Sequence, residues 1–137
     1  MSIEFNYLVF PTYYLISSPR PIARVRMASA TDSVIIDLII DSGADITLVD
    51  AVVAQELGLS PPTPNELYNI EGIGTGSFVY YRQIDMTIGE YTFPCRIGIM
   101  PSSNFTRLMG QADIFDRFAV EFRKFESKVI FTHQEEL

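Results

Sequence analysis

The order of apolar and polar residues along the chain is typical of short β-strands. Residues 20–27 (RPIARVRM) alternate between an apolar face and a face that carries two arginines, which predicts a half-buried strand. Residues 34–40 (VIIDLII) form a nearly continuous β-branched run. Such a run predicts a central strand that is buried on both faces and interrupted only by its aspartate.

A short helix is predicted in the next part of the chain. Asp50 is a suitable N-cap for residues 51–57 (AVVAQEL), and Gly58 supplies the left-handed position that commonly follows a helix. Three prolines within residues 61–64 then indicate a loop. Strands resume within ten residues, so we do not expect a domain linker here.

Residues 68–88 predict a long hairpin, because apolar and aromatic residues flank the glycine-rich stretch 72–76 (GIGTG). Gly89-Glu90 suits a tight two-residue turn into a further strand over 91–100. The remaining predicted elements are a strand at 106–110, a brief helix at 112–117 and two paired strands at 119–123 and 128–132. Many short strands with one or two short helices predict an all-β, barrel-like domain.

The composition agrees with a single packed domain. The 137 residues suffice for one hydrophobic core and are too few for two ordinary ones, and 47% of them are apolar. The formal net charge of −7 argues against a general nucleic-acid binder, which needs a positive surface to displace counterions from phosphate. We interpret the acidity as a contribution to solubility.

The single cysteine and the single histidine exclude several kinds of site. Cys95 has no second cysteine for an internal disulfide or a multi-cysteine metal site, and its apolar surroundings predict a buried thiol. His133 lies close to the C-terminus, where neither a Ser-His-Asp nor a Cys-His mechanism is expected. The sequence therefore predicts no metal and no cofactor.

No membrane-spanning segment is predicted, because no run approaches the roughly 18 apolar residues that a span needs. Residues 1–18 are rich in aromatic side chains, but they lack a basic start and contain Pro11. They are not typical of a signal peptide. A cytoplasmic location is the default expectation.

The chemistry of the chain is expected at Asp41-Ser42-Gly43, directly after the apolar run 34–40. A carboxylate at the end of a buried strand is costly unless it is hydrogen-bonded or has a task. Gly43 lets another part of the backbone approach closely, and the Ser42 hydroxyl can both donate and accept. By itself this triplet is a common turn, so its context decides the interpretation.

That context resembles the retropepsin-like aspartic proteases, which are the retroviral proteases and their cellular relatives, over about residues 20–132. Residues 41–47 (DSGADIT) are similar to the Asp-Thr/Ser-Gly-Ala signature of the family. Residues 70–78 (IEGIGTGSF) look like its flap, the glycine-rich hairpin that closes over substrate. Other segments are similar to the family's first strand (20–22), to the helix after the signature in bacterial members (54 and 57–59), and to the second signature (108–110 and 114–118).

The resemblance implies a homodimeric endopeptidase that acts on polypeptides. Each subunit would supply one Asp41, and the two carboxylates would share a proton at the two-fold axis. One would activate a water as general base, and the other would act as general acid. Independently of the resemblance, the chain holds a single Asp-Ser-Gly and is too short for two lobes, so activity requires a symmetric partner.

The resemblance also assigns roles to residues around Asp41. Ser42 would bond across the dimer, and Gly43 would contact the substrate backbone. Ala44 and Asp45 would bind substrate as well. The flap residues expected to cover the peptide and exclude water are Ile73, Gly74, Thr75 and Gly76.

The cleft walls would decide which peptide side chains are accepted. Ile46, Val79 and Ile99 are candidates for these walls. Their apolar character favours apolar residues in the substrate.

Gln111 is the main departure from the family pattern, since an arginine that braces the active-site loop usually stands at this position. The departure keeps a second hypothesis open, a non-catalytic peptide-binding or dimerisation module on the same fold. We favour the enzyme because Asp41, Gly43 and the glycine-rich hairpin are all present. A phosphate-binding role for residues 72–76 is not favoured, because an aromatic strand and not a helix follows them.

Residues 1–19 lie outside the resemblance, and we interpret them as an extension of a domain formed by residues 20–137. We expect an extra strand and loop there. The side chains expected to pack on the barrel are Phe5, Tyr7, Leu8 and Phe10. The alternative is a precursor arm that the protease trims from itself.

Overall fold

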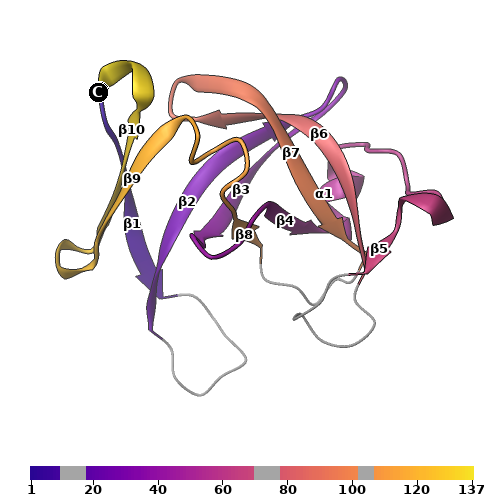
Figure 1. Cartoon of the computed structure of the whole chain (residues 1–137), viewed down its shortest axis with the longest axis horizontal. Helices are drawn as coiled ribbons and strands as arrows, with labels where there is room; N and C mark the ends of the chain where they lie inside the picture. Colours follow the sequence, from indigo (N-terminus) through magenta and orange to yellow (C-terminus); the bar gives the residue numbers. More distant parts are fainter. Residues whose placement is uncertain (10–17, 70–77, 102–106) are drawn as a thin grey trace.

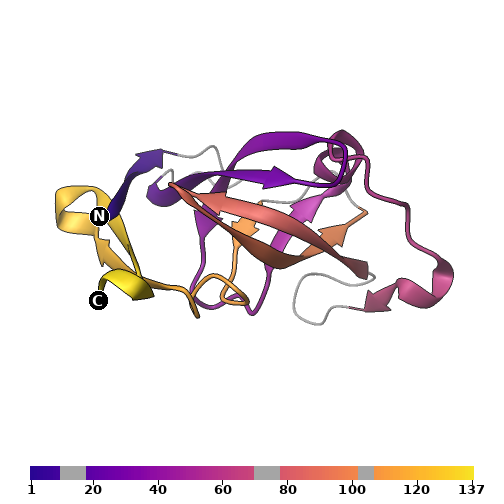
Figure 2. The same ribbon diagram turned by 90° about the horizontal axis from the view of Figure 1, so that it is seen from above.

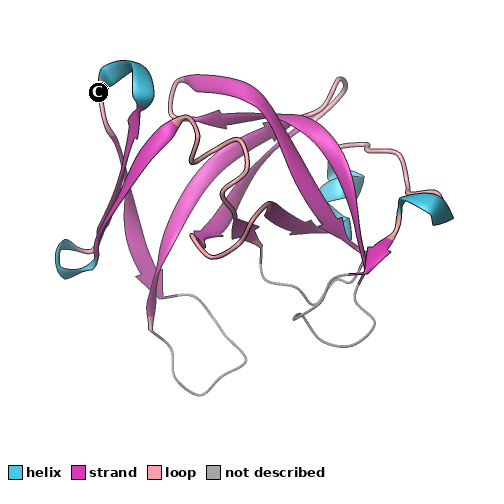
Figure 3. Ribbon diagram, in the orientation of Figure 1, coloured by secondary structure: helices cyan, strands magenta, loops and turns pink. Residues whose placement is uncertain are grey.

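The computed structural model describes residues 1–9, 18–69, 78–101 and 107–137. Within these ranges the chain is mostly β-strand, with one short α-helix, as predicted (Figures 1 and 3). The strands are β1 (Ile3–Val9), β2 (Pro19–Ala28), β3 (Ser33–Ile40), β4 (Thr47–Asp50), β5 (Tyr68–Asn69), β6 (Phe78–Ile88), β7 (Tyr91–Met100), β8 (Leu108–Met109), β9 (Phe118–Arg123) and β10 (Lys128–His133). The helices are α1 (Ala51–Glu56) and the short 3-10 helices Pro64–Glu66, Lys124–Glu126 and Gln134–Glu136.

The strands form one sheet that closes on itself. Their order is β5-β6-β7-β4-β8-β3-β2-β1-β10-β9, and β6 also pairs with β2. This second pairing joins β6, β7, β4, β8, β3 and β2 into a barrel-like unit, so the predicted architecture is confirmed. The strands β1, β10 and β9 continue the sheet at one side of that unit (Figures 1 and 2).

Apolar side chains from most of the strands fill the barrel. The largest fully buried side chains include Phe131, Met27, Leu38, Leu57 and Met86. Cys95 is also fully buried, as predicted, and desolvation raises the pKa of its thiol to about 12. The thiol therefore stays protonated at neutral pH and packs as a small apolar group.

β3 is buried on one face and not on two, which corrects the prediction for residues 34–40. Ile36, Leu38 and Ile40 point into the core, whereas Ile35 is 63% exposed. Because the sheet closes on itself, only the inner face of β3 reaches the core. The outer β-branched side chains still favour the strand conformation.

α1 begins where the sequence predicts and ends one residue earlier, at Glu56, with Leu57 as its C-cap. The Asp50 carboxylate accepts the Val53 N–H at 3.2 Å, and Gly58 follows the helix with a φ of +63°. The second predicted helix, at 112–117, is instead a succession of turns. Asp113 has a φ of +67°, which interrupts helical geometry in this segment.

β1 lies between β2 and β10, so the expected N-terminal strand is present. Phe5 packs edge-to-face on Phe131, with 5.3 Å between the ring centroids. Tyr7 is half-buried on the same face. Leu8 is 48% exposed, so the prediction that it packs on the barrel is wrong. Successive residues of a strand point to opposite faces, so Leu8 points outward when Tyr7 points inward. Phe10 lies outside the described residues.

His133 is held among aromatic side chains at the end of β10. Its ring stacks on Tyr91, with 4.1 Å between centroids, and its Nδ1 accepts the N–H of Glu135 at 3.2 Å. In the part of the chain that the structure describes, no three His, Cys, Asp or Glu side chains are grouped so as to hold a metal ion. Across the same ranges, no helix has the length and apolar character needed to cross a membrane.

Candidate active site

Asp41 directly follows the last residue of β3, Ile40. Its backbone N–H donates to the Met109 carbonyl at 2.9 Å, which continues the parallel pairing of β3 with β8 by one step. Ile40 is buried and Asp41 is partly exposed. The carboxylate therefore follows a rigid, buried strand but remains accessible to solvent and to a ligand.

The loop after Asp41 folds back onto its carboxylate. The Ala44 N–H donates to the Asp41 carbonyl at 3.1 Å, and the Gly43 N–H donates to Asp41 Oδ1 at 2.9 Å. A Cβ on residue 43 would lie 3.3 Å from the same Oδ1. Asp41 Oδ2 accepts no hydrogen bond from the described residues, so one carboxylate oxygen is fixed and the other is free to accept a further donor.

The segment after β8 also holds this loop. The Gln111 N–H donates to the Ala44 carbonyl, and the Ala112 N–H donates to the Asp45 carbonyl, both at 2.9 Å. The Gln111 side chain also donates through Nε2 to the Ser42 carbonyl at 2.5 Å. Gln111 thus braces the loop through Ser42. It does so with an amide, where the sequence resemblance leads us to expect the guanidinium of an arginine.

Gly110 allows the two segments to approach this closely. A Cβ on residue 110 would lie 2.3 Å from the carbonyl carbon of Ile46. The Gly110 N–H donates at 3.1 Å to the hydroxyl of Thr47, which is fully buried. The backbone contact therefore requires glycine here, and it sets the position of the loop 41–45 relative to β8.

Comparison with solved structures identifies the fold. A retropepsin-like aspartic protease from Rickettsia conorii matches with a TM-score of 0.66 at 14% identity, over 96% of this chain and 90% of that chain. The retroviral protease-like domain of Ddi1 from Leishmania major matches at 0.57 and 13%, over 85% and 98%. EIAV protease in complex with the inhibitor HBY-793 matches at 0.52 and 17%, over 77% and 93%. The chain has the retropepsin-like aspartic protease fold.

Comparison of structures detects the retropepsin-like fold, whereas comparison of sequences does not. No protein-family model and no curated protein matches the chain. The family resemblance inferred from the order of short motifs is thus confirmed by the fold. At 13–17% identity the likeness establishes the fold alone, because one fold can host different functions.

A second apolar cluster lies beside the Asp41 loop of this retropepsin-like fold, separate from the barrel core. We call it the satellite cluster; its members are Leu48, Val79 and Met100, with Ile46 and Tyr81 packed against them. Ile46 directly follows the loop 41–45, and Val79 and Tyr81 belong to β6. The satellite cluster therefore connects the loop with the base of the β5–β6 hairpin.

Of the three predicted cleft-wall residues, Ile46 and Val79 belong to the satellite cluster, but only Ile46 is partly exposed. The assignments of Val79 and Ile99 are wrong, because Val79 is 1% exposed and Ile99 is fully buried in the barrel core. Neighbouring residues on β7 point to opposite faces, so the core takes Ile99 and the satellite cluster takes Met100.

An ion pair that the sequence pattern did not indicate lies next to the loop. Arg107 Nε is 3.0 Å from Asp50 Oδ2, and the Asp50 side chain is only 7% exposed. The pair links the end of β4 to the residue before β8, and these strands position Thr47 and Gly110. The sequence marked Asp50 as a helix cap but gave no sign of a partner 57 residues away.

β5 and β6 form the base of the predicted long hairpin, with Tyr68 opposite Val79 and Asn69 opposite Phe78. The tip residues with expected substrate-binding roles lie outside the described residues; they are Ile73, Gly74, Thr75 and Gly76. The structure therefore describes where the hairpin begins, directly beside the satellite cluster.

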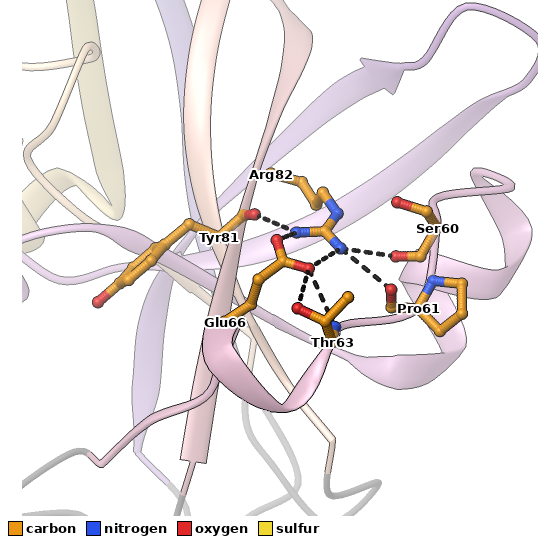
Figure 4. A network of polar contacts seen from close by, with 6 residues as sticks. All are labelled: Ser60, Pro61, Thr63, Glu66, Tyr81 and Arg82. Carbon is orange, nitrogen blue, oxygen red and sulfur yellow. Dashed lines mark hydrogen bonds and ion pairs between the residues drawn. The ribbon is translucent and has the colours of Figure 1, made fainter.

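Arg82 of β6 anchors the preceding loop to this hairpin (Figure 4). Its Nη1 donates to Glu66 Oε2 at 2.6 Å. The other acceptors of its guanidinium include the backbone carbonyls of Tyr81, Ser60 and Pro61, at 2.8, 3.1 and 3.2 Å. The pKa of Glu66 lies below its ordinary value, chiefly because of the hydrogen bond from Arg82 and then that from the Thr63 N–H. The loop 60–66 is thus bound to β6 through one arginine.

Proposed function

We propose that the chain is an aspartic endopeptidase in which two copies each contribute an Asp41 carboxylate. The observation that carries this proposal is the fixed geometry of the Asp41 loop. One carboxylate oxygen accepts the Gly43 N–H, the other is available, and both ends of the loop are hydrogen-bonded to β8 and the residues after it. The Gly43 hydrogen bond by itself is common in surface turns, but the further hydrogen bonds between the loop and residues 109–112 preorganise it, as expected of a catalytic group.

Two carboxylates are needed because a single one cannot serve as base and acid in the same step. When two carboxylates lie close together, they share one proton, since like charges at that distance cannot both ionise cheaply. The ionised Asp41 removes a proton from a water, which attacks the scissile carbonyl. The protonated Asp41 polarises that carbonyl, and a proton then passes to the leaving nitrogen.

The second copy follows from the sequence, which holds one Asp-Ser-Gly triplet. A homodimer with its two-fold axis between the Asp41 residues supplies the second carboxylate. In this arrangement the Ser42 hydroxyl bonds across the axis, and Gly43, Ala44 and Asp45 contact the substrate backbone. The hairpin tip, with Ile73, Gly74, Thr75 and Gly76, covers the bound peptide.

The substrate class is a polypeptide with apolar side chains near the cleaved bond. The satellite cluster supports this assignment because it places apolar side chains directly after the Asp41 loop. Ile46 and Tyr81 are its partly exposed members, so they are the ones that a bound side chain contacts.

A second candidate is a non-catalytic peptide-binding or dimerisation module. Gln111 favours it, because this amide replaces the charged brace usual in the family. Its hydrogen bond to the Ser42 carbonyl still fixes the loop, which supports an active site. The endopeptidase therefore remains the preferred function.

The test is cleavage of an unfolded protein substrate from acid to neutral pH by the wild type and by Asp41→Asn. The substitution keeps the size and removes the titrating carboxyl group, so we expect cleavage by the wild type and a loss of at least about 1,000-fold in the variant. Peptide binding and the dimer should remain in both. No cleavage by a wild type that is dimeric would favour the binding module.

A further inference from the structure

Arg96 of β7 lies at the rim of the satellite cluster. Its guanidinium carbon is 4.3 Å from the centroid of the Tyr81 ring, and Tyr81 packs against the cluster. The Tyr81 ring in turn lies 5.6 Å from that of Tyr68 on β5. An arginine is therefore held by stacking between the apolar wall and solvent, where it is exposed.

The pairing of β4 with β7 brings Arg96 close to the Asp41 loop. β4 and β7 are neighbouring strands (Figure 1) and are parallel. Thr47 lies opposite Ile97, so Ile46 and Arg96 each precede this pair by one residue. The Arg96 N–H also donates to Asp113 Oδ2 at 2.9 Å, which ties this point of β7 to the turn after β8. Arg96 is thus tied to Asp113, and the preceding residue Ala112 holds the Asp45 carbonyl.

The guanidinium of Arg96 forms no ion pair with any carboxylate in the ranges 1–9, 18–69, 78–101 and 107–137. The Asp113 carboxylate nearby binds the backbone N–H of Arg96, and its ion pair is with Arg117. By contrast, Arg24, Arg82 and Arg107 are all paired with acidic side chains. Stacking on Tyr81 leaves the edge of the planar guanidinium open to a bidentate acceptor.

The neighbouring loop is acidic, so a cation at this position changes how a charged substrate side chain is bound. Asp41 and Asp45 both belong to the loop, and the whole chain carries a formal charge of −7. An acidic substrate side chain is repelled by this surface unless a cation faces it. Arg96 provides such a cation, and it does so next to the side chains that are proposed to receive apolar residues.

We infer that Arg96 is a specificity-determining residue, which pairs with a Glu or Asp side chain of the peptide close to the apolar residue at the cleaved bond. This inference rests on the proposed endopeptidase function. It narrows the proposed substrate class to peptides that carry an acidic residue near the apolar one. Tyr81 acts as a positioning residue, because its ring fixes the guanidinium.

The experiment compares peptide pairs that differ only by Glu or Gln, placed in turn at each position around a cleaved bond. The wild type should favour the best-placed Glu peptide over its Gln twin by about fivefold in kcat/KM, the size expected for a partly exposed ion pair. Arg96→Gln should reduce this ratio to about one, and Arg96→Lys should keep part of it because the charge remains. Arg96→Glu should favour a Lys peptide instead.

Arg26→Gln is the matched control, since Arg26 is exposed on β2 and its guanidinium donates to the Ser33 hydroxyl at 3.3 Å. It should retain the wild-type ratio. Equal ratios in the wild type and Arg96→Gln would overturn the inference and leave the endopeptidase intact. If the wild type cleaves no peptide, the proposed function fails. In that case, dissociation constants of the fluorescent Glu and Gln peptides are measured for wild type and Arg96→Gln. A preference for the Glu peptide that is lost in Arg96→Gln would support the role of Arg96, and equal preferences would overturn it.

Discussion

At Gly110 the backbone after β8 passes so close to Ile46 that an added Cβ would lie 2.3 Å from its carbonyl carbon and 2.4 Å from its oxygen. At Gly43 an added Cβ would lie 3.3 Å from Asp41 Oδ1, a distance that a small shift relieves. The two glycines of the site therefore serve different ends. Gly110 permits the packing of two backbone segments, whereas Gly43 leaves space beside the carboxylate.

This contrast predicts that Gly110→Ala and Gly43→Ala have different effects. Gly110→Ala should lower the free energy of unfolding by about 3 kcal/mol, because rigid backbone atoms must separate. Gly43→Ala should cost under about 1 kcal/mol but reduce kcat/KM by about tenfold, because the carboxylate is displaced. Urea unfolding and peptide cleavage measure the two effects. Equal destabilisation by both substitutions would contradict the close packing described at Gly110.

Single residues of the site could be predicted from the sequence when their chemistry is local. Asp41 was predicted because a carboxylate after an apolar run is conspicuous, and Asp50 because a cap precedes its helix. The pairing of Asp50 with Arg107 could not be predicted, since it depends on the positions of β4 and β8 in space. Val79 and Ile99 were misassigned for a similar reason, because their burial depends on how β6 and β7 pack against the rest of the fold.

At the scale of elements, the ion pair of Arg82 and Glu66 determines how the loop 60–66 lies against β6 (Figure 4). The Arg82 side chain is 15% exposed and makes several hydrogen bonds to the loop. By contrast, Arg24 forms an ion pair with Asp37 on the outer surface, where its side chain is 71% exposed. Ion pairs in these two environments should contribute differently to stability.

We predict that Arg82→Leu lowers the free energy of unfolding by about 2 kcal/mol, because the loop loses a charged donor to several acceptors. Arg24→Leu, the control, should have a clearly smaller effect, because its ion pair is exposed to solvent. Thermal unfolding at neutral pH measures both. Equal effects would show that Arg82 contributes no more than an ordinary surface charge.

The same network predicts a pH dependence. The folded-state pKa of Glu66 is lowered from the ordinary 4.5, so its contribution to stability is complete above that pH. It is lost as the pH falls through the lowered folded-state value. The difference in Tm between the wild type and Glu66→Gln should therefore be present at neutral pH and vanish in acid. A difference that is constant with pH would contradict this account.

Elements were predictable from the sequence where one local signal determined them. The strands β2, β7, β9 and β10 and the helix α1 follow from alternation and capping. The turns over residues 112–117 were predicted as a helix, because the positive φ of Asp113 leaves no mark in the sequence. The one-sided burial of β3 was also missed, since it results from closure of the barrel.

At the scale of the whole molecule, the described chain supplies one Asp41 loop, and the proposed mechanism needs two. The barrel-like unit was predictable from the number and shortness of the strands. Its closure through β6 and β2 was not, because that contact joins strands that are distant in the sequence. The proposed two-fold assembly makes one property of the molecule measurable without knowledge of its natural substrate.

The measurement is activity in mixtures of wild type and Asp41→Asn, allowed to exchange subunits and held at constant total protein. If each active site needs two Asp41 carboxylates, activity follows the square of the wild-type fraction, and an equal mixture retains about one quarter of the wild-type activity. Size-exclusion chromatography of differently tagged chains checks that mixed dimers form. Activity that falls in direct proportion, to about one half, although mixed dimers are present, would contradict the shared site and place the complete catalytic machinery in a single chain.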